Sequence, residues 1–211
     1  MLEKAFGHPT DRHGPTTGAH SLQMIEPSLA TVETDAHFMH EALRQALRAY
    51  KAEEVPVGAV IVRESRIIAR SFNQVELLKD ATAHAEMLAI TQAEESVGDW
   101  RLNDCCLYVT KEPCAMCAGA MVHARLGRVV FGAGDPKAGA AGGALNLLQF
   151  PSFNHRCEIL GGVREPECRE LLQKFFAEQR SKPSAPGTDP AVTKESVNEA
   201  PRWPKGAKPV N

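Results

Sequence analysis

The sequence contains no apolar run long enough to cross a bilayer. Its N-terminus also lacks the basic patch and apolar stretch of a secretory signal. Positive charge is not in excess: 24 Lys and Arg stand against 26 Asp and Glu, and the net charge is −2. General polyanion binders are usually basic overall, so the composition argues against that class. We therefore expect a cytoplasmic protein without a membrane partner.

The chain has enough apolar residues for a buried core. Its 211 residues are 43% hydrophobic, which is typical of one globular domain. We expect a flexible arm over residues 1–33, a folded domain over 34–180, and a disordered, proline-rich tail over 181–211. The basic residues of the tail leave two interpretations open: an ordinary solvated tail, or an arm that weakly attracts phosphate.

Six cysteines are present. In a reducing compartment, a closely spaced pair is more often a metal or redox site than a disulfide. Cys114 and Cys117 form such a pair. The remaining four are predicted to be buried thiols that pack like small hydrophobes: Cys105, Cys106, Cys157 and Cys168.

Between the two arms, predicted helices alternate with predicted strands. Asp35 or a nearby residue is predicted to cap a first helix that runs to about Ala52. Helical spacing gives this helix an apolar face made of Phe38, Met39, Ala42, Leu43, Ala46 and Leu47. Strands are predicted over residues 55–62, 67–72, 106–110, 128–132 and 158–163. Further helices are predicted over residues 83–96, 115–125, 145–149 and from 166 through 176. This alternation implies an α/β fold whose sheet is covered on both faces.

Two short motifs fall at predicted helix starts. One runs from His84 to Glu86, and the other from Pro113 to Cys117. Zinc takes nitrogen and sulfur ligands in a tetrahedron, and two cysteines three residues apart on a first helical turn can direct both sulfurs to one point. The N-terminal end of a helix also favours the thiolate form that binds metal. We predict one zinc ion per subunit, held by His84, Cys114 and Cys117.

Three protein ligands leave the fourth position open, which is typical of catalytic zinc. The metal would generate a nucleophile from water near neutral pH. Glu86 is the predicted proton carrier that takes the proton of the water and helps ammonia leave. The combination of His-x-Glu with Pro-Cys-x-x-Cys is the known signature of zinc nucleobase deaminases, so this prediction is a match to an established pattern. Each half alone has a simpler explanation, a redox or structural Cys-x-x-Cys and an ordinary helix start.

Beyond these motifs, the chain from about residue 35 to 180 resembles the bacterial tRNA-specific adenosine deaminases, which convert the wobble adenosine of a tRNA anticodon to inosine. The matching segments are Val55 to Val60, the Asn73 region, Thr82 to Glu86, Leu107 to Ala120, Gly127 to Ala133, Asp135 to Gly142, Asn154 to Arg156, and Phe175-Phe176. The resemblance implies a three-layer α/β/α cytidine-deaminase-like fold with a five-stranded mixed sheet. It also implies hydrolytic deamination, a homodimer, and a tRNA anticodon stem-loop as partner.

The resemblance further implies a set of RNA contacts. Asn73 would contact the flipped adenine, the Asp135–Lys137 loop would line the path of the anticodon strand, and Phe150 to His155 would hold neighbouring nucleotides. Chemistry agrees, because a base must be splayed out to reach a buried metal, and aromatic and basic side chains can meet bases and phosphates. The implied substrate-binding set is Asn73, Asp135, Lys137, Phe150, Phe153, Asn154 and Arg156. Plainer interpretations stay open: a core position for Phe153, a turn for Asn73, and a solvated Lys137.

The chain departs from the family pattern at a few positions. Lys111 stands where the family usually has an apolar residue, and Pro136 and Ala138 alter the Asp135 loop. These departures concern loop shape and substrate fit, and they leave the metal ligands untouched.

Two other functions remain open. One is a deaminase of a free base or nucleotide such as guanine or cytosine. The other is a non-catalytic zinc-binding subunit, which should lack a proton carrier such as Glu86.

Overall fold

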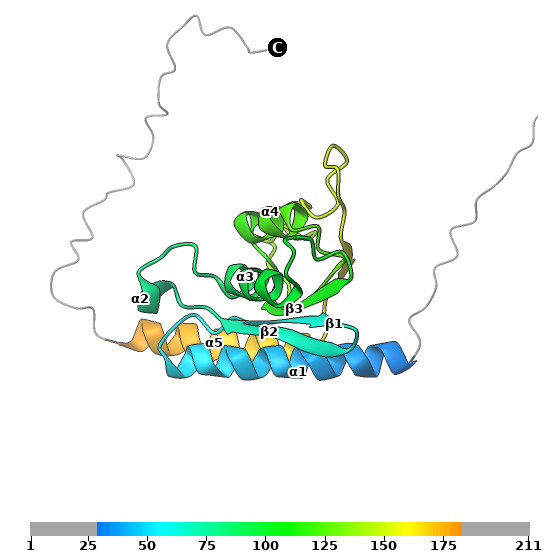
Figure 1. The fold of residues 1–211 in the computed structure, drawn as a ribbon. Helices are drawn as coiled ribbons and strands as arrows, with labels where there is room; N and C mark the ends of the chain where they lie inside the picture. The colour runs from blue at the N-terminus through cyan, green and yellow to red at the C-terminus, as the bar shows by residue number, and fades with distance from the viewer. Residues whose placement is uncertain (1–28, 183–211) are drawn as a thin grey trace, which may run out of the picture.

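The computed structural model describes residues 29–182, which form a five-stranded sheet between two helical layers (Figure 1). Most of the expected arm and nearly all of the expected tail lie outside these described residues. The strand order is β2-β1-β3-β4-β5. The bounds of the strands are β1 (Gly58–Arg63), β2 (Arg66–Phe72), β3 (Cys105–Lys111), β4 (Arg128–Ala133) and β5 (Glu158–Leu160).

Two helices cover each face of the sheet. Figure 1 shows α1 (Leu29–Lys51) and α5 (Glu165–Ser181) side by side below it, and α3 (Ala85–Val97) and α4 (Ala115–His123) above it. A separate apolar core fills each interface. Val60, Tyr108 and Val130 belong to the core with α1, and Ile61, Leu107 and Val129 belong to the core with α3 and α4. Neighbouring strand residues point to opposite faces, so each strand contributes to both cores. The predicted α/β/α class with a five-stranded mixed sheet is confirmed.

The direction of the strands brings distant segments to one edge of the sheet. β1 pairs antiparallel with β2 and β3, whereas β3, β4 and β5 run parallel. The start of β1 therefore lies beside the ends of β2 and β3. The residues that flank these strand ends are Val57, Asn73 and Glu112, and they meet at this edge.

A close approach between α1 and β1 fixes the lower layer. A Cβ atom at Gly58 would overlap the backbone of Ala42 and Ala46. Glycine is therefore required where the helix crosses the strand. The Gly58 N–H donates to Thr110 Oγ1 at 3.1 Å, which also ties the start of β1 to the end of β3.

The first helix differs from its prediction in two respects. It begins at Leu29, so Asp35 is an interior residue and not a cap. The buried Asp35 carboxylate instead accepts hydrogen bonds from Arg128 at 2.7 and 3.0 Å and from Tyr108 at 2.8 Å. Leu47, predicted on the apolar face, is 46% exposed, and Ala49 is buried in its place.

Residues 145–149 do not form the predicted helix. The Leu147 N–H donates to Ala140 O, and the Gln149 N–H donates to the side chain of Asn146. These bonds replace the helical pattern because a side chain and a distant carbonyl take the donors that a helix would use. A short helix, α2 (Val75–Leu78), was not predicted.

Three of the four predicted structural thiols are buried, and Cys106 is partly exposed. Burial raises the pKa of Cys105, Cys106 and Cys157 to about 11 and that of Cys168 to about 12. These cysteines therefore behave as neutral packing residues. Within the described residues, no helix is long and apolar enough to span a membrane.

Candidate metal centre and substrate pocket

The predicted metal ligands come from the starts of two neighbouring helices. His84 is the N-cap of α3, and Cys114 is the N-cap of α4. Both residues have extended backbone, so their side chains leave the helix axis, while Cys117 lies in the first turn of α4 and is fully buried. Contacts between α3 and α4 bring the two helix starts together.

The ligand atoms form a compact triangle. The distances are 3.7 Å between Cys114 Sγ and His84 Nδ1, 3.4 Å between Cys117 Sγ and His84 Nδ1, and 3.7 Å between the two sulfurs. Tetrahedral zinc with bonds of about 2.3 Å to sulfur and about 2.05 Å to nitrogen requires about 3.8 Å between two sulfurs and about 3.6 Å between sulfur and nitrogen. The three atoms are therefore spaced as zinc requires, and the structure brings together a group that can hold a metal ion.

The two cysteines of the cluster have shifted acidities. The hydrogen bond with Cys117 is the largest cause that lowers the pKa of Cys114 to about 4. The same hydrogen bond, together with burial, raises the pKa of Cys117. A metal that binds both sulfurs as thiolates would displace any proton that they share.

Glu86 lies beside this cluster in the first turn of α3 and is only 4% exposed. Burial raises the pKa of its carboxyl group, while the His84 ring lowers it and the Cys114 sulfur raises it. The carboxyl group thus lies where a proton carrier for a metal-bound water would be needed.

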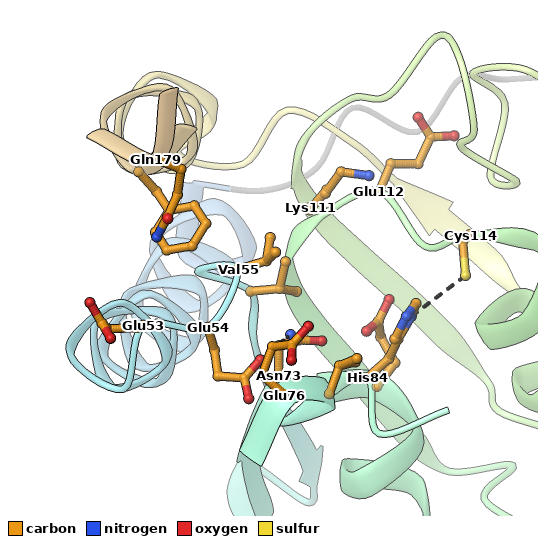
Figure 2. A pocket seen from close by; sticks show the side chains of 14 residues that line it. Glu53, Glu54, Val55, Asn73, Glu76, His84, Lys111, Glu112, Cys114 and Gln179 are labelled. Carbon is orange, nitrogen blue, oxygen red and sulfur yellow. Dashed lines mark hydrogen bonds between the residues drawn. The ribbon is translucent and has the colours of Figure 1, made fainter. Parts of the chain in front are cut away.

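A pocket of about 600 Å³ opens over the cluster. Figure 2 shows His84 and Cys114 on one side of it, Asn73 and Glu54 on the facing side, and Gln179 of α5 farther out. The volume lies in the range of small-molecule sites, which span about 300–1,000 Å³. The pocket therefore can admit a single base but not a base-paired helix.

Asn73 is buried at the end of β2, and it lines this pocket. Its backbone N–H donates to Val57 O at 2.9 Å, and its side-chain Nδ2 donates to Glu54 Oε2 at 3.0 Å. Its position is therefore determined by contacts with the segment before β1, and not only by a turn.

Glu112, which sequence reasoning did not assign to the site, organises the loop after β4. Its buried carboxylate accepts N–H bonds from Asp135 at 2.7 Å, Ala141 at 3.0 Å and Gly143 at 2.8 Å. A Cβ atom at Gly139 would overlap this carboxylate. The only sequence signal was an acid that directly follows a buried strand and precedes Pro113.

The Lys111 departure has a structural partner. Lys111 Nζ donates to Asp135 Oδ2 at 2.5 Å, and this bond is the largest cause that lowers the pKa of Asp135. The other Asp135 oxygen accepts the N–H groups of Lys137 and Ala138. Lys111 itself lines the pocket, whereas the side chain of Lys137 is exposed.

The other predicted RNA contacts lie elsewhere on the described part of the chain. Phe153 and Asn154 line a second groove of about 860 Å³ with residues of α3 and α4. Phe150 packs on Phe153 with ring centroids 5.1 Å apart, and both rings are exposed by 44% and 39%. Arg156 donates to Pro151 O at 3.1 Å. A core position for Phe153 is therefore wrong, and none of these four residues lines the metal pocket of the same chain.

Comparisons with known proteins agree on one class. The model of the MafB19-like deaminase family matches residues 33–180. The tRNA-specific adenosine deaminase of Bacillus subtilis (strain 168) is 50% identical over 151 residues, which are 72% of this chain and 94% of that protein. That of Agrobacterium fabrum is 45% identical over 144 residues, which cover 68% of this chain and 95% of that protein.

A solved structure from a study of A-to-I editing by tRNA:A34 deaminases at the wobble position of transfer RNA also matches. It is 45% identical, has a TM-score of 0.62, and covers 64% of this chain and 99% of that chain. The three-layer fold, the His/Cys/Cys cluster and the family match define a deaminase of the cytidine-deaminase-like fold. Within that class, the chain belongs to the family of tRNA-specific adenosine deaminases.

Proposed function

We propose that this protein hydrolyses the wobble adenosine of a tRNA anticodon loop to inosine, with one zinc ion per subunit. The observation that carries this proposal is the 50% identity to a tRNA-specific adenosine deaminase over 94% of that relative's length. The spacing of His84, Cys114 and Cys117 supports the metal, since it fits tetrahedral zinc. A cytoplasmic location accords with a tRNA substrate.

The chemistry is divided between the metal and Glu86. His84, Cys114 and Cys117 would hold the zinc ion, which when bound would supply a Lewis acid that lowers the pKa of water toward neutral pH. The buried Glu86 carboxylate accepts the proton of the attacking water and delivers it to the base. The water oxygen adds to C6 of adenine as its first proton goes to the ring nitrogen. The proton of the added hydroxyl then passes to N6, the C6–N6 bond breaks, and ammonia leaves, so the net reaction is hydrolysis.

The target nucleotide must flip out of the stacked anticodon loop, because the residues of the metal cluster line the pocket and only a single base can enter it. We assign Asn73 to the flipped base, since it is buried, lines the pocket and carries both a donor and an acceptor. Substituting Asn73→Ala is expected to reduce deamination of an anticodon stem-loop strongly. Near-normal activity would reject this assignment.

A homodimer explains the position of the remaining predicted contacts. Phe150, Phe153, Asn154 and Arg156 lie away from the pocket of their own chain, next to the groove between α3 and α4. Exposed Trp100 adds apolar surface along this groove. A second copy seated here can carry the Phe150–Arg156 segment to the other copy's pocket. Light scattering of the purified chain tests this state, and a monomeric mass for the active enzyme would contradict it.

One incubation separates the proposed function from its alternative. The zinc-loaded protein is given an anticodon stem-loop with adenosine at the wobble position and, separately, guanine and cytidine. We expect inosine in the stem-loop and equimolar ammonia, with no ammonia from guanine or cytidine. Ammonia from a free base alone would replace this proposal with a small-molecule deaminase.

A further inference from the structure

We propose that Glu54 is a positioning residue for the reaction: it fixes the side-chain amide of Asn73 in one orientation and so sets the order of donor and acceptor that the pocket presents to the base. This inference rests on the proposed role of Asn73 in binding the target base.

Glu54 occupies an unusual place for an acid. It lies in the connection between α1 and β1 and is only 1% exposed, so its side chain is among the largest that are fully buried. It lines the metal pocket next to Asn73, as Figure 2 shows. Burying a carboxylate is costly unless hydrogen bonds compensate it. Such an acid therefore needs specific partners.

Both carboxylate oxygens have a partner. Oε2 accepts from Asn73 Nδ2 at 3.0 Å, and Oε1 accepts from the Leu77 N–H of α2 at 2.7 Å. The carboxylate thus joins three segments: the connection before β1, the end of β2, and α2. Because Leu77 holds one oxygen, the other stays aimed at Asn73.

The chemistry of this contact removes the ambiguity of an amide. A carboxylate can only accept hydrogen bonds, so the Asn73 NH₂ group, and not its oxygen, must face Glu54. The amide oxygen Oδ1 and the second Nδ2 hydrogen then remain for a ligand, at fixed positions. Without Glu54, the side chain can rotate by half a turn and exchange the two groups.

The fixed order matters for recognition of adenine. Adenine carries an N6 amino donor beside a ring-nitrogen acceptor, whereas guanine presents two acceptors, O6 and N7, on the corresponding edge. The Asn73 amide in its fixed orientation can pair its oxygen with a donor of the base and its NH₂ group with an acceptor. After rotation, donor would face donor and acceptor would face acceptor. Glu54 therefore contributes to the choice of base without contacting the base.

A double-mutant cycle separates this role from a purely structural one. The full-length, zinc-loaded variants Glu54→Gln, Asn73→Ala and the double variant are assayed for kcat/KM on the anticodon stem-loop. We expect each single change to reduce kcat/KM about 100-fold, as a misplaced binding group does. The double variant should also lose only about 100-fold, because Glu54 acts through Asn73. An additive loss of about 10,000-fold would overturn the proposal.

A second pair of variants tests the contact between Glu54 and Asn73 by melting temperature, which can be measured even if activity is lost. Asn73→Asp places a second carboxylate against Glu54, and like charges at this distance repel. Adding Glu54→Gln should then raise the melting temperature of the Asn73→Asp protein, although it lowers that of the wild type. A lower melting temperature in both backgrounds would contradict the contact.

The matched control is Glu95→Gln, which changes an exposed acid of α3 that does not line the pocket. It should leave kcat/KM unchanged. The activity of the wild-type protein in the same assay tests the proposed function separately from the role of Glu54. If it does not deaminate the stem-loop, the proposed function fails, whereas the melting-temperature test still decides whether Glu54 holds Asn73.

Discussion

The metal ligands and the opposite wall of the pocket are assembled in different ways. His84, Cys114 and Cys117 belong to two local motifs at helix starts, and packing of two helices is enough to bring them together. The facing wall depends on the buried carboxylate of Glu54, and the loop after β4 depends on that of Glu112. These two carboxylates accept N–H groups from residues 19 to 31 positions away. The two ligand motifs can therefore be recognised from short spacings along the chain, whereas the partners of Glu54 and Glu112 follow no local motif.

The cysteines of the domain also fall into two groups, which differ in the pKa of the thiol. Burial raises the pKa of Cys105 and Cys157 to about 11, whereas the hydrogen bond with Cys117 is the main cause that lowers the pKa of Cys114 to about 4. One residue type thus has two chemistries within one small domain.

Substitutions in the two parts of the site should change different quantities. Those at the metal cluster should change the catalytic rate and the metal content, and those elsewhere should change stability and substrate fit.

The largest expected effect is at Glu86. Glu86→Gln removes the proposed proton carrier but keeps the size of the side chain, so kcat should fall by about 10²–10⁴-fold. The metal content, measured by atomic emission, should stay at that of the wild type. Unchanged turnover would reject the catalytic model and favour a non-catalytic zinc-binding subunit.

The next effect is loss of the metal. Cys117→Ser removes one sulfur of the ligand triangle, so the purified variant should lose stoichiometric zinc together with activity. Cys157→Ser is the matched control, because Cys157 is a buried thiol outside the cluster. A Cys117→Ser protein that retains one zinc per chain would show that the ligands have been misassigned.

In the loop after β4, Glu112→Gln should mainly lower stability. The amide keeps one oxygen but directs an NH₂ group at backbone donors, which leaves at least one buried N–H without an acceptor. Such a loss costs about 1–3 kcal/mol of unfolding free energy. Urea denaturation measures it, with exposed Glu95→Gln as the control. If both variants unfold at the same urea concentration, the carboxylate does not organise the loop.

The smallest effect is expected for Lys111→Leu, which restores the residue type usual in the family. The Lys111–Asp135 pair is partly exposed, so its loss should cost no more than about 1 kcal/mol. The pair lowers the pKa of Asp135 below its ordinary value of 3.8. Its contribution is therefore present at neutral pH and is lost as the pH falls through the lowered pKa. The difference in melting temperature between variant and wild type should therefore shrink as the pH falls. A difference independent of pH would exclude the ion pair as its source.

Sequence reasoning was most successful where spacing along the chain determines geometry. The starts of α3 and α4 lie within two residues of their predicted positions, and the cysteine spacing places both sulfurs 3.7 Å apart. Glu54 was missed because its partners, Asn73 and Leu77, lie in other segments. Nothing in the local pattern distinguishes this buried acid from its exposed neighbour Glu53.

The errors have a similar origin. The predicted helix at residues 145–149 fails because Ala140 and the Asn146 side chain take its donors. Asp35 looked like a cap because aspartate favours helix starts, yet it is held inside α1 by Arg128 and Tyr108, both more than 70 positions away. In both cases, hydrogen bonds outside the regular helical pattern overrode a local preference.

The placement of His84 and Cys114 at the caps of α3 and α4 has a consequence for dynamics. Helix ends are the segments that open first in local unfolding, and a zinc ion shared by two such ends would cross-link them. Amide hydrogen exchange in the first turns of both helices should therefore slow together when the metal binds. Exchange at these few amides would report metal occupancy residue by residue, independently of any measurement of turnover.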